Sequence, residues 1–217
     1  MISITQPKPF EEVLKFISRD QKIYLVGCGT CTTTQHTGGK AEVLAMKEKL
    51  ETAGKKVTGW MVIPTACDPL TQQALAVNTR EIEAADSILA MPCSFGILTI
   101  ALYTSKPVYP ALDTIFIGKE QSPGNFTEAC IQCGGCVLGK TATICPITRC
   151  AKSLFNGPCG GSINGKCEVD PNTPCGWQQI IDRLTAQDRL DQLDEIEPLK
   201  DWSTSLSGGP RQIILES

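Results

Sequence analysis

The first 110 residues alternate between short apolar runs and longer segments with helical spacing. The apolar runs, each typical of a buried strand, are 22–26, 56–63, 87–91 and 106–109. Apolar positions at helical spacing predict helices over 9–18, 39–53, 70–80 and 97–103. Strands that alternate with helices are typical of a parallel sheet covered on both faces. We therefore expect an α/β fold, with a small Rossmann-like or flavodoxin-like domain.

The second half of the chain has a different pattern. A polar, turn-rich segment at 117–125 predicts a boundary that divides the chain into domains 1–118 and 119–217. Beyond it, the segments 156–161 and 170–175 contain too much Gly and Pro for regular structure. We expect an irregular cysteine-rich, metal-binding region there.

Regular structure is expected to return near the end of the chain. The segment 177–196 places apolar residues at helical spacing, which predicts a C-terminal helix. The residues of its apolar face are Trp177, Ile180, Ile181 and Leu184. A polar tail, 203–217, follows this helix.

Charge and hydropathy exclude several classes of protein. The formal net charge of −3 argues against nucleic-acid binding, which usually requires a basic face. No run of about 18 apolar residues is present, so we expect no membrane insertion. The N-terminal residues do not resemble a secretory signal, and we expect a cytoplasmic protein.

The most informative feature of the composition is its twelve cysteines. Stable disulfides are rare in a reducing cytoplasm, so dense cysteine points to metal or redox chemistry rather than to a disulfide scaffold. Four of the cysteines follow predicted strands: Cys28, Cys31, Cys67 and Cys93. Parallel strands present their carboxyl ends at one edge, where four thiolates would suit a [4Fe–4S] cluster or zinc. The alternative is that Cys67 and Cys93 are ordinary buried thiols.

The other eight cysteines lie close together in the sequence: Cys130, Cys133, Cys136, Cys145, Cys150, Cys159, Cys167 and Cys175. The first three have the CxxCxxC spacing of bacterial-type ferredoxin ligands. Cys145 precedes a proline, as the fourth ferredoxin ligand does, but it comes after eight residues rather than three. The assignment of Cys145 and Cys150 therefore stays open, and so does zinc at the Cys159, Cys167 and Cys175 group. All twelve cysteines are predicted metal ligands, holding two or three clusters, and the second region is expected to fold with its metal.

Several strings in the chain resemble a known family, the cysteine-rich methylenetetrahydrofolate reductase C-terminal family. The strings of the second half are CPITRCAKSL at 145–154, NGPCGG at 156–161, GKCEVD at 165–170 and CGWQQIIDRL at 175–184. As a separate chain, the sequence is similar to the small iron–sulfur subunit of acetogen-type methylenetetrahydrofolate reductase. GCGTC at 27–31 and TGGK at 37–40 resemble the first half of that subunit.

The resemblance implies an electron-transfer subunit of an oxidoreductase in one-carbon metabolism. A partner flavoprotein subunit would bind the flavin and reduce 5,10-methylenetetrahydrofolate to 5-methyltetrahydrofolate. The present chain would pass electrons to that flavin from ferredoxin or another redox subunit. Two alternatives stay open: a zinc-dependent structural module that scaffolds the flavoprotein, and an enzyme in its own right with an open cluster or corrinoid-linked methyl transfer.

Overall fold

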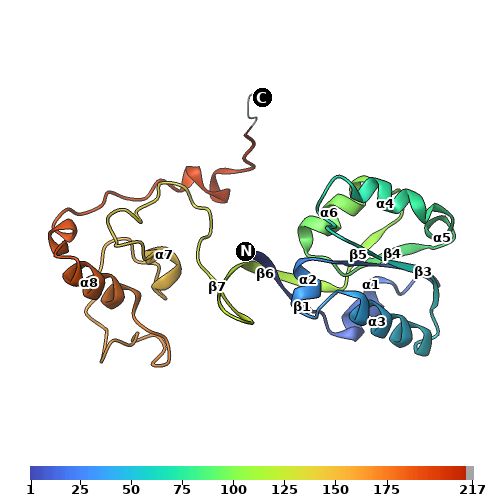
Figure 1. Cartoon of the computed structure of the whole chain (residues 1–217), viewed down its shortest axis with the longest axis horizontal. Coiled ribbons are helices and arrows are strands. Elements are labelled where there is room, and N and C mark those ends of the chain that lie inside the picture. The colour runs from blue at the N-terminus through green and yellow to red at the C-terminus, as the bar shows by residue number, and fades with distance from the viewer. Residues whose placement is uncertain (214–217) are drawn as a thin grey trace. The chain divides into compact units, whose positions relative to one another are not determined.

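The computed structural model describes residues 1–213, and the chain divides into two units between Thr127 and Glu128 (Figure 1). The sequence prediction placed this division after residue 118. The first unit extends further because a long strand runs through the polar segment on which that prediction was based.

The elements of the first unit follow one another as strands and helices (Figure 1). Its strands are β1 (Ile2–Pro7), β2 (Lys22–Cys28), β3 (Lys56–Ile63), β4 (Ser87–Ala90), β5 (Val108–Pro110), β6 (Leu112–Ser122) and β7 (Asn125–Glu128), whose last residue is the first of the second unit. Its helices are α1 (Phe10–Phe16), α2 (Cys31–Thr34), α3 (Lys40–Thr52), α4 (Thr71–Val77), α5 (Thr79–Glu83) and α6 (Ser94–Leu102).

A four-stranded parallel sheet forms the centre of this unit, in the order β3-β2-β4-β5. Helices cover both faces: α1 and α3 pack on one face, and α4, α5 and α6 on the other. Strand β2 is buried along almost its whole length, as expected for a central strand covered on both sides. The expected α/β class is confirmed. Counted among the parallel strands alone, the order is 2-1-3-4, which begins the flavodoxin-like arrangement.

A second sheet, β1-β6-β7, was not predicted from the sequence. Strand β1 pairs antiparallel with β6, from Ile2 opposite Gly118 to Pro7 opposite Leu112. The buried residues of β1 are Ser3 and Thr5, which are polar. The sequence of this strand therefore lacks the alternating apolar residues by which a strand is predicted. The polar residues of β6 suit an antiparallel strand with one face towards solvent.

Two predicted helices differ from the observed ones. The segment 70–80 is divided at Asn78 into α4 and α5. The predicted helix 177–196 is α8 (Gly176–Ala186), and the chain leaves helical geometry at Asp188, which has a left-handed φ of 52°. Asn and Asp are weak helix formers, because their side chains compete for backbone hydrogen bonds.

The second unit is mostly irregular, as expected. Besides α8, residues 128–213 contain one short helix, α7 (Pro146–Arg149), and three 3₁₀ turns, η1 (Leu190–Leu193), η2 (Trp202–Thr204) and η3 (Leu206–Gly208). Its small core gathers Trp177, Ile180 and Leu184 of α8 against Ala142. The indole Nε1 of Trp177 donates to the carbonyl of Leu154 at 3.0 Å. No helix within residues 1–213 is both long enough and apolar enough to cross a bilayer.

Candidate metal centres

The first candidate site lies at the carboxyl end of the parallel sheet. Its members, called here the strand-end cysteines, are Cys28, Cys31, Cys67 and Cys93. Cys28 is the last residue of β2, Cys31 is the first residue of α2, and Cys93 directly precedes α6. Cys67 lies in the turn after β3. The strand order reverses between β2 and β4, and such a switch point is where open α/β sheets bind ligands.

Backbone contacts hold these strand ends together. The Gly29 amide donates to the Ile63 carbonyl at 2.8 Å, which joins the ends of β2 and β3. The Met91 amide donates to the Val26 carbonyl at 2.8 Å, which joins the ends of β2 and β4. A Cβ atom on Gly96 would lie 2.6 Å from Pro92 and 2.9 Å from Ala66, so only glycine allows α6 to approach the Cys67 turn this closely.

The thiols of this site influence one another electrostatically. Cys28 and Cys93 are buried, whereas Cys31 is half-buried and Cys67 is exposed. Partial burial of its sulfur raises the pKa of the Cys67 thiol, and the charges of Cys93, Cys28 and Cys31 raise this pKa further. The Cys67 sulfur therefore lies within electrostatic range of the other three cysteines, and a bound cationic centre would favour its thiolate form.

The second candidate site surrounds a cavity in the second unit. The cavity has a volume of about 100 Å³ and a largely apolar lining. Four cysteines contribute to its wall, and we call them the loop cysteines: Cys130, Cys133, Cys136 and Cys145. The sequence left open whether Cys145 or Cys150 accompanies the CxxCxxC run. Among the described residues that line the cavity, Cys145 is present and Cys150 is not.

The backbone of the CxxCxxC loop has an unusual conformation. Gln132, Gly134 and Gly135 all have left-handed φ angles, of 52°, 66° and 48°. The Gln132 amide donates to the sulfur of Cys130 at 3.3 Å. Backbones that mix left-handed and right-handed residues form concave nests of N–H groups, which bind anions and occur at many iron–sulfur sites.

The remaining four cysteines, called the hairpin cysteines, are Cys150, Cys159, Cys167 and Cys175. Two backbone hydrogen bonds tie their loops together, from the Cys167 amide to Thr173 at 2.9 Å and from the Cys175 amide to Gly165 at 2.8 Å. Cys150 and Cys175 pack against the same small core. The Cys159 sulfur lies 3.9 Å from the carboxylate of Glu168, the neighbour of Cys167. The Cys167 and Cys175 loops are thus joined by hydrogen bonds, and Cys150 and Cys175 share one core.

All twelve cysteines fall within the described residues and are free thiols. Within residues 1–213, no three His, Cys, Asp or Glu side chains converge closely enough to hold a single metal ion. The ligands of a polynuclear cluster are spaced more widely than those of one ion, because each thiolate binds a different iron atom. The loop cysteines all line one cavity, so their arrangement is compatible with ligands of such a cluster.

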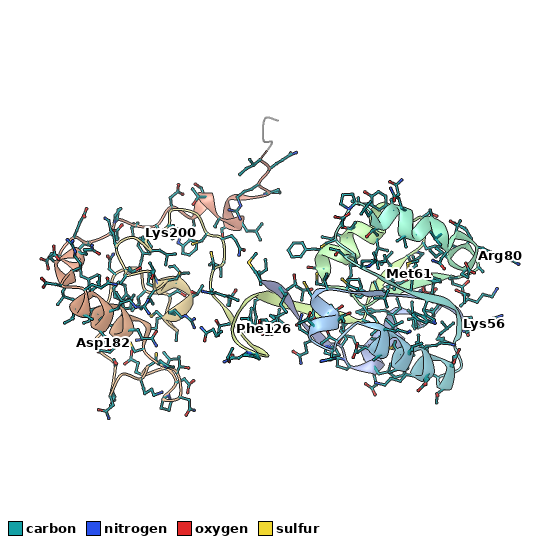
Figure 2. The ribbon with its side chains drawn as sticks, in the orientation of Figure 1. Lys56, Met61, Arg80, Phe126, Asp182 and Lys200 are labelled. Carbon is teal, nitrogen blue, oxygen red and sulfur yellow. The ribbon has the colours of Figure 1, made fainter. Side chains whose placement is uncertain are left out.

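Sequence reasoning missed one charged residue at the loop site. Lys200 lines the cavity, and its ammonium donates to the Gly134 carbonyl at 2.5 Å (Figure 2). The ammonium also lies over the rings of Phe155 and Trp202, 5.7 Å and 5.5 Å from their centroids. Lys200 is 66 residues from Gly134 in the chain, and no local pattern marks such a contact.

Comparison with known proteins gives one finding. Residues 109–203 match the family model described as "Methylene-tetrahydrofolate reductase C terminal". The matched range contains all the loop cysteines, all the hairpin cysteines and Lys200. No curated protein and no solved structure matches the chain. This part of the chain is thus similar to the methylene-tetrahydrofolate reductase C-terminal family.

Proposed function

We propose that the chain is the iron–sulfur electron-transfer subunit of a methylenetetrahydrofolate reductase. The observation that carries this proposal is the cavity walled by the four loop cysteines. Four thiols around a cavity of about 100 Å³ fit a cubane [4Fe–4S] cluster in ligand type and number. The apolar lining also fits, because burial from solvent is one of the ways by which a protein tunes a cluster.

Each group of cysteines has a separate role in this proposal. The loop cysteines hold one cluster, and the nest of loop amides faces its sulfurs. The strand-end cysteines hold a second cluster at the switch point of the sheet. The hairpin cysteines hold a third metal centre, either a cluster or zinc, beside the core of α8. Once bound, the clusters accept and donate single electrons, and the chain positions them and sets their potentials.

Under this proposal the reduction of the folate takes place in a partner subunit. That partner is a flavoprotein, which would bind 5,10-methylenetetrahydrofolate and the flavin. The electron donor is ferredoxin or another redox subunit, and the assembly is a cytoplasmic hetero-oligomer. The family match supports the link to this oxidoreductase, and the thiol-rich sites support the electron-transfer role.

The test is anaerobic quantitation of iron, sulfide and zinc in the full chain, with EPR spectra of the reduced protein. Two or three [4Fe–4S] clusters would contribute about eight to twelve iron atoms with matching sulfide. Stoichiometric zinc with almost no iron would instead identify a structural module and overturn the proposal.

A pair of variants tests which cysteines act together. We expect Cys145→Ala to lose the EPR signal of the loop cluster, because Cys145 lines that cavity. Cys150→Ala is the matched control in the same unit, and it should keep that signal. If both variants lost the EPR signal of the loop cluster and had the same iron content as each other, the assignment of Cys145 rather than Cys150 to the loop cysteines would be wrong.

A further inference from the structure

The tail of the chain crosses the CxxCxxC loop and binds its backbone. We define residues 195–211 as the tail strap. Arg211 donates to the Gln132 carbonyl at 3.1 Å. The Thr204 hydroxyl donates to the Cys133 carbonyl at 3.0 Å, and the Asp201 carbonyl, at the same distance, is the alternative acceptor of its one proton. The Lys200 ammonium donates to the carbonyls of Gly134 at 2.5 Å and Gly135 at 3.3 Å. Four consecutive loop carbonyls therefore accept hydrogen bonds from the strap.

The strap is fixed to the rest of its unit as well as to the loop. The side chain of Asn156 makes two hydrogen bonds to the backbone of Glu197, at 2.8 Å and 2.9 Å. Lys140 forms ion pairs with Glu195 and Glu197. Within the strap, Arg211 also donates to the Thr204 carbonyl at 2.8 Å. These contacts fix the strap, and with it the donor groups of Lys200, Thr204 and Arg211, independently of their hydrogen bonds to the loop.

These hydrogen bonds determine the direction of the loop amides. In a trans peptide the carbonyl and the following N–H point in opposite directions. Carbonyls bound by the strap therefore direct the next N–H groups away from the strap. Close packing supports this arrangement, because a Cβ atom on Gly134 would lie 2.6 Å from the Thr204 hydroxyl. A strap in this position would hold the loop N–H groups on the opposite side of the loop, as in the nests that bind anions.

Lys200 adds a positive charge at the same place. Among the described residues that line the cavity, it is the only charged one. Its ammonium is held by the two loop carbonyls and by cation–π contacts with Phe155 and Trp202. A thiolate-ligated cluster becomes more negative when it is reduced, so a cation fixed beside it favours the reduced state.

We infer that the tail strap sets the reduction potential of the loop cluster, with Lys200 as the residue that raises it and with Thr204 and Arg211 holding the loop backbone. This inference rests on the proposed function, because it requires a cluster at the loop cysteines. Lys200 acts here as a positioning and charge-supplying residue rather than as a ligand.

The first test is an EPR-monitored redox titration of the anaerobically prepared full chain. We expect Lys200→Gln to keep its iron and to lower the midpoint of one cluster. The reduction equilibrium constant should fall about fivefold to tenfold, as expected for one partly screened charge, and tenfold corresponds to about 59 mV for one electron. Lys200→Arg should stay near the wild-type midpoint. Arg189→Gln, which removes an exposed charge elsewhere in the unit, should leave it unchanged.

The second test does not depend on the potential. We expect Thr204→Val to accelerate hydrogen exchange of the 130–136 amides by about tenfold, because one carbonyl anchor of the loop is lost. Thr185→Val, in α8, is the matched control and should leave exchange in the loop unchanged.

The outcomes separate the two proposals. Intact clusters with an unchanged midpoint in Lys200→Gln would overturn the role of Lys200 and leave the electron-transfer function standing. Unchanged loop exchange in Thr204→Val would overturn the role of the strap. A wild-type chain without iron would overturn the proposed function itself.

Discussion

The strand-end site and the loop site gather thiols in opposite ways. The strand-end cysteines span residues 28 to 93 and lie at one edge of the sheet, because a buried parallel sheet aligns its carboxyl ends. The loop cysteines span residues 130 to 145, and three of them are placed by local spacing. The first site rests on two extensive apolar clusters, whereas the small core of the second unit contains four buried residues. Under the proposed function, a metal centre would be an addition to the folded first unit, whereas it would contribute to the folding of the second.

Metal removal should show the largest difference between the two units. After chelation of the metal, we expect residues 128–213 to become accessible to protease while residues 1–127 stay resistant. The reason is that bound metal supplies about 10 kcal/mol or more to small metal-dependent folds. Limited proteolysis with mass spectrometry, on metal-loaded and metal-free chain, measures this effect. If both units were equally resistant to protease without metal, the second unit would not depend on metal for its folding, and the contrast with the first unit would be wrong.

Core truncation should have the next largest effect, and it acts on the first unit. Leu25 lies in β2 and is fully buried. We expect Leu25→Ala to lower the free energy of unfolding of the metal-free first unit by about 2–5 kcal/mol, because a cavity replaces the side chain. Urea denaturation followed by circular dichroism measures the change. Leu98→Ala, at an exposed position of α6, is the control and should cost much less.

Removal of a strand-end thiol should affect the metal without affecting the fold. Cys67 is exposed, so Cys67→Ala is expected to change the stability of the first unit by about 0.5 kcal/mol or less. The same variant should lose the iron of the strand-end site. Iron analysis and urea denaturation of one preparation provide both readouts. A strand-end site that keeps all its iron in this variant would show that Cys67 is not a ligand.

The last effect appears only at alkaline pH and concerns Tyr24, a fully buried residue of β2 whose hydroxyl has no hydrogen-bond partner among the described residues. Burial raises the pKa of Tyr24 to about 12, and the charge of Glu81 adds to this effect. The fold thus favours the neutral phenol, and this contribution to stability is complete below about pH 10 and is lost as the pH rises through about 12. Tyr24→Phe should remove this alkaline slope at nearly unchanged neutral stability. Stability curves of both proteins from pH 9 to 12 test it, and equal slopes would contradict the assignment.

Much of the first unit was predictable, because its elements carry local signals. The predicted strand 56–63 coincides with β3, and the helices at 9–18 and 39–53 match α1 and α3 to within a few residues. The strand β1 was missed because its inward residues, Ser3 and Thr5, are polar. Strand β6 was missed because its polar residues face partly towards solvent. Both strands depend on pairing with distant partners, which no local pattern contains.

The chain's order of residues was sufficient to predict the parallel α/β unit and to place four cysteines after its strands, whereas the metal chemistry of the cysteines stays a prediction. These properties follow from hydrophobic period, turn-forming residues and short cysteine spacings, which are local. The inclusion of Cys145 in the wall of the loop cavity and the hydrogen bonds of Lys200, Thr204 and Arg211 to the loop emerged with the folded structure. These contacts join residues that are far apart in the chain. The acceptors of the hydrogen bonds are backbone carbonyls, which every residue has, so the sequence does not show which carbonyl is bound. Only the three-dimensional packing decides it.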